Sequence, residues 1–390
     1  MKVGLIVYGG EGWLGGRNYF RNLLRAVMHQ ADRTIEPVVL TGHQNSDSFS
    51  DCPQIEIIRS RLFDSGFMLR YARKSITLLS RRDLLVEQLL RRNRISVLSH
   101  SGHLGSRALL PTTGWIPDFQ TIHLPQFTSP KERKQRMRRL RELCENCTKV
   151  ILSSENARND FDRFAPAYAT KAEILRFVAT PIPREATTTL PELREKYGFE
   201  RDYFLLPNQF WAHKNHRTVI TALMNLKKRA KTQFVIATGS AADSRNPGYF
   251  QSLLAYAREC DVMDCFRVLG IVPYADLAGL MRSSIALINP SLFEGWSTSV
   301  EESKSVGKRI VLSDIPVHRE QDPEGGIYFP ALDAEALAES MLRARDLSDQ
   351  QVDLDREERA LARFPIRERE FACRFEQIAL AAARLGKAKF

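Results

Sequence analysis

The chain has 390 residues, of which 43% are hydrophobic and 26% charged, and its formal net charge is +11. This length exceeds what one hydrophobic core usually serves, so two domains of a globular protein are expected. No run of about 18 apolar residues occurs, which argues against a membrane-spanning helix. The opening residues, MKVGLIVYGG, predict a strand rather than a signal peptide.

The positive charge is concentrated in the first half of the chain. Residues 1–184 carry 29 Lys and Arg against 17 Asp and Glu, a net charge of +12, whereas residues 185–390 carry 28 against 29, a net charge of −1. The excess gathers in Arg70–Arg94 and Lys131–Arg141, where periodic Leu and Met predict helices with basic faces. Such faces are either simply solvated or attracted to an anionic membrane surface or a pyrophosphate-linked acceptor. Nucleic acid is not an expected partner, because the basic runs lack interleaved aromatic residues and a known motif.

The six cysteines are scattered, and only Cys144 and Cys147 form a CxxC pair. No second pair completes a metal-ligand pattern, so two partly buried structural thiols are favoured over a zinc or redox site. Free thiols suit a reducing compartment, and the expected location is the cytoplasm.

In the first half, strand-like apolar runs alternate with helical patterns, which predicts an α/β class with parallel sheets. The expected strands are Val3–Tyr8, Pro37–Leu40, Ser96–Ser99, Thr113–Ile116, Lys149–Ser153 and Glu173–Phe177.

The stretch Ala179–Pro191 is rich in proline and contains three consecutive threonines, which predicts an interdomain linker. We therefore expect an N-terminal domain over 1–180, a linker over 181–192 and a C-terminal domain over 193–366. A long amphipathic helix is expected after Pro365, over Arg367–Leu385. The second series of strands comprises Tyr203–Leu206, Phe234–Ala237, Phe266–Leu269, Ile285–Ile288 and Arg309–Leu312.

The most informative segment is Asn289–Glu302, NPSLFEGWSTSVEE, in which Glu294 and Glu302 lie eight residues apart. A buried strand precedes it, and a helical pattern that stops at Gly307 comes after it. A helix N-terminus offers backbone N–H groups and a positive dipole end, which suits a pyrophosphate. Carboxylates on either side can accept hydrogen bonds from sugar hydroxyls. The combination indicates a ligand with phosphate in the middle and polyols at both ends, such as a nucleotide-sugar.

The segment FEGWSTSVEESKSVGKRIVLSD resembles the Glu-x7-Glu signature of retaining, family 4-type glycosyltransferases (glycosyl transferases group 1), which have the GT-B fold. Both glutamates, Gly295 and Gly307 match that signature. The sequence departs at Trp296, at Ser297 and at the pair Thr298 and Ser299, where the family usually has Phe, Gly, and an apolar residue followed by Pro. The alternative interpretation is an ordinary helix start with two solvated glutamates.

The resemblance implies two Rossmann-like domains facing a cleft, with the nucleotide-sugar donor in the cleft. It also implies that the C-terminal helix, 367–390, packs back on the first domain.

Two further stretches resemble the family's donor site. Gly15 and Gly16, in GEGWLGGRNYFRNLL, stand where the family has a loop that borders the acceptor and the donor phosphates. Pro207–His216, PNQFWAHKNH, resembles the segment G-R-x4-K-G, whose Arg and Lys hold the diphosphate. Lys214 matches the Lys, whereas Gln209 stands at the Arg position. The candidates to supply the missing cation are His213, His216 and Arg217.

Gly239 and Val272 come after two strands of the second domain, at the edge where open α/β sheets bind ligands. The resemblance implies that the nucleobase lies near the second of these loops, held largely by backbone groups.

The acceptor side carries a weaker match. The family usually has a His-Asp pair after the fourth strand, and here the corresponding residues are Pro117 and Asp118, with His123 shortly after. Asp118 would orient the acceptor hydroxyl or the donor sugar, and His123 would take over a contact. A helix-capping Asp and an ordinary loop His are the alternatives. For His100 and His103, at another strand end, structural roles are favoured.

The resemblance implies a mechanism in which the acceptor attacks on the face from which the diphosphate leaves. A covalent intermediate on a protein nucleophile is the alternative. Lys214 and the N–H groups of Ser297–Ser299 would stabilise the leaving diphosphate. Glu294 would hold the sugar and Glu302 the ribose, with no metal ion and no cofactor.

The expected function is sugar transfer to a glycan or lipid-linked acceptor in surface polysaccharide biosynthesis. The alternatives are an epimerase-like GT-B enzyme, a phosphorylase and a non-catalytic GT-B binding protein.

Overall fold

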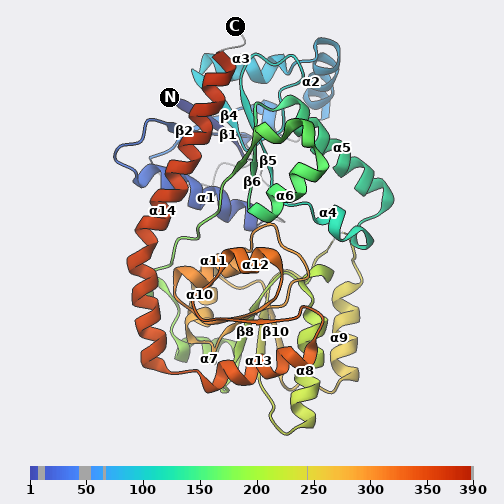
Figure 1. The fold of residues 1–390 in the computed structure, drawn as a ribbon, viewed down its shortest axis with the longest axis vertical. Coiled ribbons are helices and arrows are strands. Elements are labelled where there is room, and N and C mark those ends of the chain that lie inside the picture. The colour runs from blue at the N-terminus through green and yellow to red at the C-terminus, as the bar shows by residue number, and fades with distance from the viewer. Residues whose placement is uncertain (8–13, 44–53, 65–66, 244, 388–390) are drawn as a thin grey trace. The chain divides into compact units, whose positions relative to one another are not determined.

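The computed structural model describes residues 1–7, 14–43, 54–64, 67–243 and 245–387. The chain divides into two compact units (Figure 1). The first comprises Met1–Phe119, Lys131–Val178 and Ile366–Phe390, and the second comprises Gln120–Pro130 and Ala179–Pro365. Each unit contains one parallel sheet with helices, which confirms the predicted α/β class with two Rossmann-like domains.

The first unit has a seven-stranded parallel sheet in the order β3-β2-β1-β4-β5-β6-β7. Every residue of β1 after Lys2 is buried, as are all but one in β2 and β4, which is typical of strands covered on both faces. The strands are β1 (Lys2–Ile6), β2 (Glu36–Thr41), β3 (Glu56–Arg59), β4 (Ile95–Ser99), β5 (Thr112–Ile116), β6 (Lys149–Leu152) and β7 (Ala172–Ile174). The helices of this unit are α1 (Leu14–His29), α2 (Phe67–Ser80), α3 (Leu84–Arg92), α5 (Pro130–Asn146) and α6 (Glu155–Phe164).

The second unit has a six-stranded parallel sheet in the order β10-β9-β8-β11-β12-β13. In chain order, the first and fourth strands of this sheet are neighbours. The chain adds its first three strands toward one edge of the sheet and the later ones toward the other edge, so the strand order reverses between these two neighbours. The strands are β8 (Phe204–Pro207), β9 (Val235–Thr238), β10 (Phe266–Gly270), β11 (Leu287–Asn289), β12 (Ile310–Ser313) and β13 (Gly326–Phe329). The helices are α4 (Gln120–His123), α7 (Leu190–Tyr197), α8 (His216–Lys228), α9 (Tyr249–Glu259), α10 (Tyr274–Ser283), α11 (Thr298–Ser305), α12 (Pro316–Gln321) and α13 (Ala334–Asp346).

Local sequence explains where several helices begin and end. Thr189 and Glu192 form a reciprocal capping box at the start of α7, and Gly198 ends that helix with φ 65°. Asp333 caps α13 by accepting hydrogen bonds from the first backbone N–H groups. The expected linker therefore ends earlier than the sequence predicts, because its last residues form the first turn of α7.

Two strands escaped the sequence analysis. Both β3, with the sequence EIIR, and β13, with GIYF, are four residues long and lie at a sheet edge. EIIR has only two apolar residues between charged ones, and GIYF has only three apolar residues between Gly326 and Pro330, so both patterns are too short to distinguish a strand from a loop.

The last helix, α14 (Gln350–Lys387), begins before Pro365 and continues through it, so the prediction that the helix starts after this proline is wrong. The division between the two units falls at Pro365 and Ile366. In the second unit, Glu357 accepts a hydrogen bond from Arg282, at 2.8 Å. In the first unit, Arg374 pairs with Glu173 at 2.8 Å.

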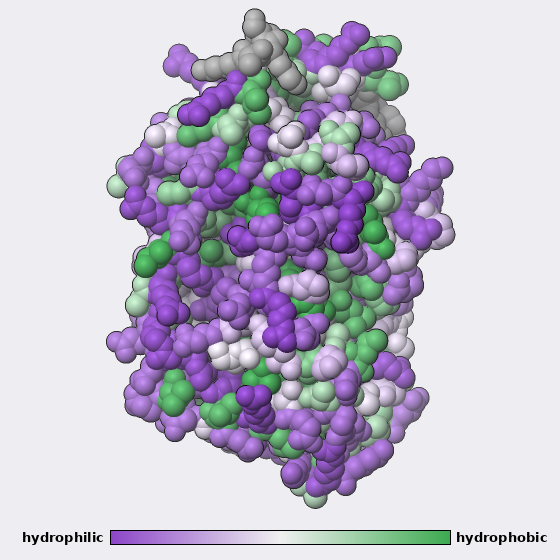
Figure 2. All heavy atoms as spheres, viewed as in Figure 1, coloured by the Kyte–Doolittle hydropathy of each residue, from purple (hydrophilic) through white to green (hydrophobic). Residues whose placement is uncertain are grey.

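None of the helices among the described residues is long and apolar enough to cross a membrane. Hydrophilic residues cover most of the face shown in Figure 2, with hydrophobic residues scattered between them.

Candidate functional site

The site forms where β8 and β11 end, at the reversal point of the second sheet. The segment after β8 leads through Ala212–Lys214 into α8, and Asn215 adopts a left-handed backbone with φ 57°. The Asn215 amide donates hydrogen bonds to the carbonyls of Pro290, at 3.0 Å, and Ala331, at 2.7 Å. The Leu292 N–H donates to the His213 carbonyl at 2.8 Å. These bonds fix the segment after β8 against the segment after β11.

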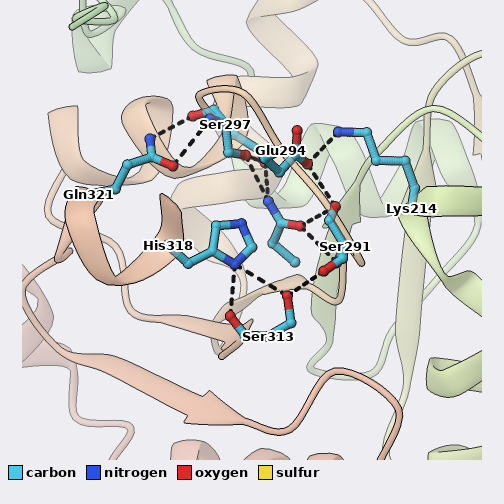
Figure 3. Close-up of polar contacts among 9 residues, drawn as sticks. Lys214, Ser291, Glu294, Ser297, Ser313, His318 and Gln321 are labelled. Atoms are coloured by element: carbon cyan, nitrogen blue, oxygen red, sulfur yellow. Dashed lines mark hydrogen bonds and ion pairs between the residues drawn. The ribbon is translucent and has the colours of Figure 1, made fainter. Parts of the chain in front are cut away.

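The two segments bring Lys214 and Glu294 together. Lys214 Nζ lies 2.5 Å from Glu294 Oε1, and both side chains are largely buried (Figure 3). The Ser291 hydroxyl donates to the same Glu294 oxygen at 2.7 Å. Burial alone would raise the pKa of the Glu294 carboxyl, but the neighbouring Lys214 charge outweighs it and lowers this pKa. Glu294 is therefore an ionised carboxylate at neutral pH.

Asn289 organises the loop beneath this ion pair. Its carbonyl oxygen lies 2.7 Å from the Ser291 hydroxyl, which has one proton for this oxygen and for Glu294 Oε1. The Asn289 amide donates to Ser297 Oγ at 2.8 Å and Ser299 Oγ at 3.1 Å. The side chains of Asn289 and of the three serines are buried. Ser297 and Ser299 are two of the positions at which the sequence departs from the family signature. In this chain they anchor the loop by pairing with Asn289.

Gln321, at the end of α12, contacts the backbone of Ser297 twice. Its oxygen accepts from the Ser297 N–H at 3.1 Å, and its amide donates to the Ser297 carbonyl at 3.0 Å (Figure 3). The prediction that the Ser297 N–H is available for a diphosphate is therefore wrong. Thr298 and Ser299 are the first residues of α11, so their N–H groups have no acceptor within that helix.

His318 lies under the same loop. Its Nδ1 donates to the Ser313 carbonyl at 2.9 Å, and Ser313 Oγ donates to the Ser291 carbonyl at 2.6 Å. Burial lowers the pKa of His318 to about 4, so the ring is neutral at physiological pH. Gln321, Ser313 and His318 were missed by sequence reasoning, because they come from β12 and α12, and no motif spacing relates them to Glu294.

Glu302 lies one helical turn into α11. The hydroxyl of Tyr274, which begins α10, donates to Glu302 Oε1 at 3.4 Å. Burial raises the pKa of Glu302 to about 7, against the opposing effect of the Tyr274 hydrogen bond. The two glutamates of the motif thus differ in charge state, because Glu294 has a cationic partner and Glu302 has a neutral one.

Gly239 joins the strand ends of the same sheet. Its N–H donates to the Gly270 carbonyl at 2.8 Å, and its φ of 128° suits glycine. A Cβ at this position would lie 2.6 Å from the Asn208 carbonyl oxygen. Gly239 therefore permits the close approach of the segments after β8, β9 and β10, the last of which carries Val272.

Of the two residues expected on the acceptor side, only one lies in the unit that carries the glutamates. His123, in α4, stacks on Phe293 with ring centroids 5.0 Å apart and an interplanar angle of 27°. Phe293 directly precedes Glu294. Asp118 lies in the first unit, where it pairs with Arg136 at 2.9 Å. The segment Gln120–Pro130, which the sequence analysis assigns to the first domain, thus groups with the second unit.

Gly15 and Gly16 lie in the first turn of α1 rather than in the loop before it. Residues 8–13, which precede them, are outside the described residues. Trp296 and Gly295 are partly exposed in the loop that leads to α11.

None of the three residues proposed to replace the cation missing at Gln209 does so. Burial lowers the pKa of His213 and of His216 to about 3, so both rings are neutral. Arg217 stacks over the Tyr256 ring, 3.7 Å from its centroid. These three expectations are therefore wrong.

Within the described ranges, no group of three or more His, Cys, Asp or Glu side chains is arranged to hold a metal ion. Cys144 and Cys147 are both buried thiols, and burial raises the pKa of each to about 11. They pack in the apolar core around α5 and β6, in a structural role.

The chain is similar to several known glycosyltransferases. The family model "Glycosyl transferases group 1" matches residues 191–360. O-antigen chain mannosyltransferase B of Escherichia coli is 23% identical over 230 residues, 58% of this chain and 59% of the relative. O-antigen chain mannosyltransferase RfbU of Salmonella typhimurium is 25% identical over 203 residues, 52% of each chain. The chain thus spans little more than half the length of these relatives.

Solved structures show the same fold over nearly the whole chain. HepE of Anabaena in complex with UDP-glucose has a TM-score of 0.68 at 14% identity, covering 97% of this chain and 99% of that one. WaaG, a glycosyltransferase involved in lipopolysaccharide biosynthesis, has a TM-score of 0.60 at 15% identity, covering 95% and 99%. The family match over residues 191–360 lies within the second unit and covers less than half of the chain, so this chain is similar to glycosyl transferases group 1 over its second unit and has the GT-B fold of two Rossmann-like units.

Proposed function

We propose that this chain is a glycosyltransferase that moves a sugar from a nucleotide-sugar to a glycan or lipid-linked acceptor in surface polysaccharide biosynthesis. The observation that carries the proposal is the buried pair of Lys214 and Glu294 beside the N-terminus of α11. The family match and the names of the two O-antigen relatives support the same conclusion.

Each group of the pair has a distinct part in binding the donor. The Lys214 ammonium has three N–H donors and uses one on Glu294, so it can contact a diphosphate while it keeps that bond. Glu294 Oε1 accepts from Lys214 and Ser291. Its second oxygen can then accept from hydroxyls of the donor sugar. The N–H groups of Thr298 and Ser299 face the same diphosphate at the positive end of α11.

Glu302 is proposed to accept hydrogen bonds from the ribose hydroxyls, and the segment around Val272 to border the base. Tyr274 contacts Glu302 and comes directly after that segment, which supports this division. On the acceptor side, the ring of His123 beside Phe293 is proposed to line the place of the incoming hydroxyl.

The proposed step retains the configuration of the sugar. The bond between the anomeric carbon and the diphosphate oxygen breaks, and the acceptor oxygen forms a bond to the same carbon on the same face. The proton of the acceptor hydroxyl passes to the departing diphosphate oxygen. The protein then mainly stabilises the charge that develops on the leaving group, which Lys214 and the α11 N–H groups are aligned to do. We propose that neither a metal ion nor a cofactor takes part, so activity should survive a strong chelator.

An epimerase-like enzyme and a non-catalytic binding protein are the alternatives. An epimerase would release an altered sugar without an acceptor, and a binding protein would need no ionised Glu294 held against a lysine. The combination of Lys214, Glu294 and Glu302 favours the transferase.

A panel of UDP-, GDP- and dTDP-sugars tests the proposal. A donor at 100 times its dissociation constant should stabilise the protein by about 2.7 kcal/mol, which a thermal shift detects. With a glycan acceptor, the matching donor should release free nucleotide, and the anomeric configuration of the product distinguishes retention from inversion. Binding without turnover on any acceptor would favour the non-catalytic alternative, and an altered sugar without acceptor would favour the epimerase.

We also propose that the chain acts at the inner face of the cell membrane, held peripherally by its first unit. Helix α5 buries Leu140, Leu143 and Cys144 and exposes a row of cations on its other side. Helix α2 ends in Leu78 and Leu79, which are 81% and 86% exposed. The exposed Arg81 follows the last residue of this helix, Ser80, and its carbonyl accepts from the N–H of the exposed Arg107 at 3.1 Å. Exposed leucines next to arginines suit an anionic lipid surface.

Vesicles of phosphatidylcholine with and without phosphatidylserine test this part. Binding should require the anionic lipid and fall as salt rises, because each exposed cation contributes about 1 kcal/mol that salt screens. Changing Leu78 and Leu79 to Ser, or reversing the charge of Arg138 and Arg139, should weaken binding. Leu332→Ser is the matched control, because Leu332 is 78% exposed in the second unit. A wild-type chain that ignores anionic vesicles at low salt would indicate a soluble acceptor.

A further inference from the structure

Among the residues proposed to hold the donor, Lys214 is the single side-chain cation at the diphosphate. Gln209 stands where the family signature has a second cation, His213 and His216 are neutral, and Arg217 stacks elsewhere. A diphosphate carries a negative charge on each phosphate. The described part of the chain nevertheless contains another guanidinium, which lies over the ring of Trp211, two residues after Gln209.

That guanidinium belongs to the segment after β9, which runs next to the segment after β8. The Phe210 N–H donates to the Ser240 carbonyl at 3.1 Å, and Trp211 Nε1 donates to the Ala242 carbonyl at 3.4 Å. A Cβ at Gly239 would lie 2.6 Å from the Asn208 carbonyl oxygen and 3.0 Å from Gln209 Cα, so the two segments pass close to each other there. Residues 239–243 therefore lie against the backbone that carries Gln209.

Arg245 is held at the end of this segment from three directions. Its guanidinium lies over the Trp211 ring, 4.9 Å from the centroid. Its Nε donates to Asp243 Oδ1 at 3.1 Å, and Asp243 is 7% exposed. Its Nη1 donates to Gln120 Oε1 at 3.4 Å. The side chain of Arg245 is itself only 23% exposed.

The charge of Arg245 acts on a residue next to Lys214. The positive charge of Arg245 is one of the causes that lower the pKa of His213, after burial and the charge of Lys214. His213 directly precedes Lys214 and its carbonyl binds the loop of Glu294. The guanidinium of Arg245 therefore lies within electrostatic reach of the residues that border the proposed diphosphate.

We propose that Arg245 supplies the second cation of the donor diphosphate site, in place of the residue that Gln209 replaces. This inference rests on the proposed function. A guanidinium presents a planar fork of N–H donors that matches phosphate oxygens, and its stacking on Trp211 orients that fork in advance. Asp243 accepts from Nε and Gln120 accepts one hydrogen bond from Nη1, so the guanidinium, with five N–H donors, has further donors to offer a ligand. The second cation thus comes from the neighbouring strand end rather than from the motif itself.

The test compares ligands with and without a diphosphate, measured by calorimetry on the full chain. Arg245→Gln should weaken binding of the nucleoside diphosphate of the matching donor about tenfold, because a hydrogen bond to a charged group is lost. Binding of the corresponding nucleoside, which has no phosphate, should not change. Arg217→Gln is the control, because it removes an arginine of the same unit that stacks on Tyr256.

Restoring a cation at the motif position completes the test. Adding Gln209→Arg to Arg245→Gln should recover most of the lost affinity. If removal of Arg245 leaves the buried Asp243 unpaired and the protein unfolds, the double change of Arg245→Gln with Asp243→Asn removes both charges and serves the same purpose. Unchanged diphosphate affinity in the folded variant overturns the role of Arg245 while the proposed function stands. A wild-type chain that binds no nucleoside diphosphate overturns both.

Discussion

The two sheets share a strand order but differ in the residues at the end of their fourth strand. In the first unit, β4 is followed by His100, whose Nε2 lies 2.7 Å from the Tyr19 hydroxyl and whose Nδ1 lies 2.9 Å from Ser99 Oγ. The Tyr19 ring stacks on Trp115 with centroids 4.4 Å apart. In the second unit, β11 ends in Asn289, and polar residues that include the Glu294 ion pair surround it.

The difference shows that the reversal point of a parallel sheet does not by itself make a ligand site. The residues that follow the strands there must also supply groups that can bind a ligand. His100 is buried, both of its nitrogens have partners, and burial lowers its pKa to about 3. It is a neutral residue within an aromatic core. Glu294 has an ionised carboxylate and Lys214 has spare N–H donors. The residues after the strands therefore distinguish the two edges, and mutations at the edge of the proposed site should have different effects from mutations at the other edge.

The largest effect is expected from Lys214→Ala. The change removes a charge aimed at the leaving diphosphate and should lower turnover on the order of a hundredfold. Release of nucleotide in the presence of acceptor measures it. Lys228→Ala, at the exposed end of α8, is the matched control. Turnover within threefold of the wild type, in a variant that melts normally, would mean that Lys214 does not face the leaving group.

The next largest effect is expected from Glu294→Gln. The amide can still accept from Ser291, but the negative charge that pairs with Lys214, and that we propose holds the sugar hydroxyls, is lost. Turnover should fall at least about tenfold, the worth of a lost hydrogen bond to a charged group. Glu339→Gln, on the exposed face of α13, controls for a change of charge alone. Full activity would remove Glu294 from the site.

The sequence predicted the fold through its periodicity, and its motif pointed to the residues of the candidate site. Glu294 and Lys214 could be paired in advance because each comes after a strand and matches a known signature, and the structure brings them to 2.5 Å. Gln321 and Arg245 could not be foreseen. Each reaches the site through a contact between distant segments, and a polar residue in a loop carries no sign of such a contact.

Charge states also lie beyond the sequence. His213 next to Lys214 suggested a second cation, and burial makes it neutral. The two glutamates look equivalent in the motif, yet their pKa values shift in opposite directions. The burial that causes these shifts is a property of packing, which a pattern of residue types does not specify.

A smaller effect is expected from Glu302→Gln, and it should depend on pH. Because burial raises the pKa of Glu302 to about 7, its carboxyl is protonated below that pH and ionised above it. An ionised Glu302 is the better acceptor for ribose hydroxyls, so nucleotide affinity of the wild type should rise between about pH 5.5 and 7.5. The variant should lack this rise and bind at least about tenfold more weakly at pH 8. Calorimetry across the pH range measures both.

Glu302 also makes the free energy of unfolding depend on pH. A carboxyl whose pKa is higher in the folded state stabilises the fold below its unfolded pKa of 4.5. That contribution is lost as pH rises through about 7. The buried histidines act in the opposite direction, because their lowered pKa values remove stability as pH falls below 6.5. The difference in unfolding free energy between wild type and Glu302→Gln isolates the glutamate and should change in the predicted direction.

The smallest effect on catalysis is expected at the other edge, from Tyr19→Phe. The change keeps the stacked ring but leaves His100 Nε2 buried without its partner, which costs about 1–3 kcal/mol of unfolding free energy. Denaturant titration measures this loss, and Tyr168→Phe, a partly buried tyrosine of the same unit, is the control. Nucleotide affinity should be unchanged, because Tyr19 lies in the unit that lacks the Lys214 and Glu294 pair. Tenfold weaker nucleotide binding by a folded Tyr19→Phe variant would contradict the distinction between the two sheet edges. The aromatic residues that surround His100 would then affect ligand binding as well as stability.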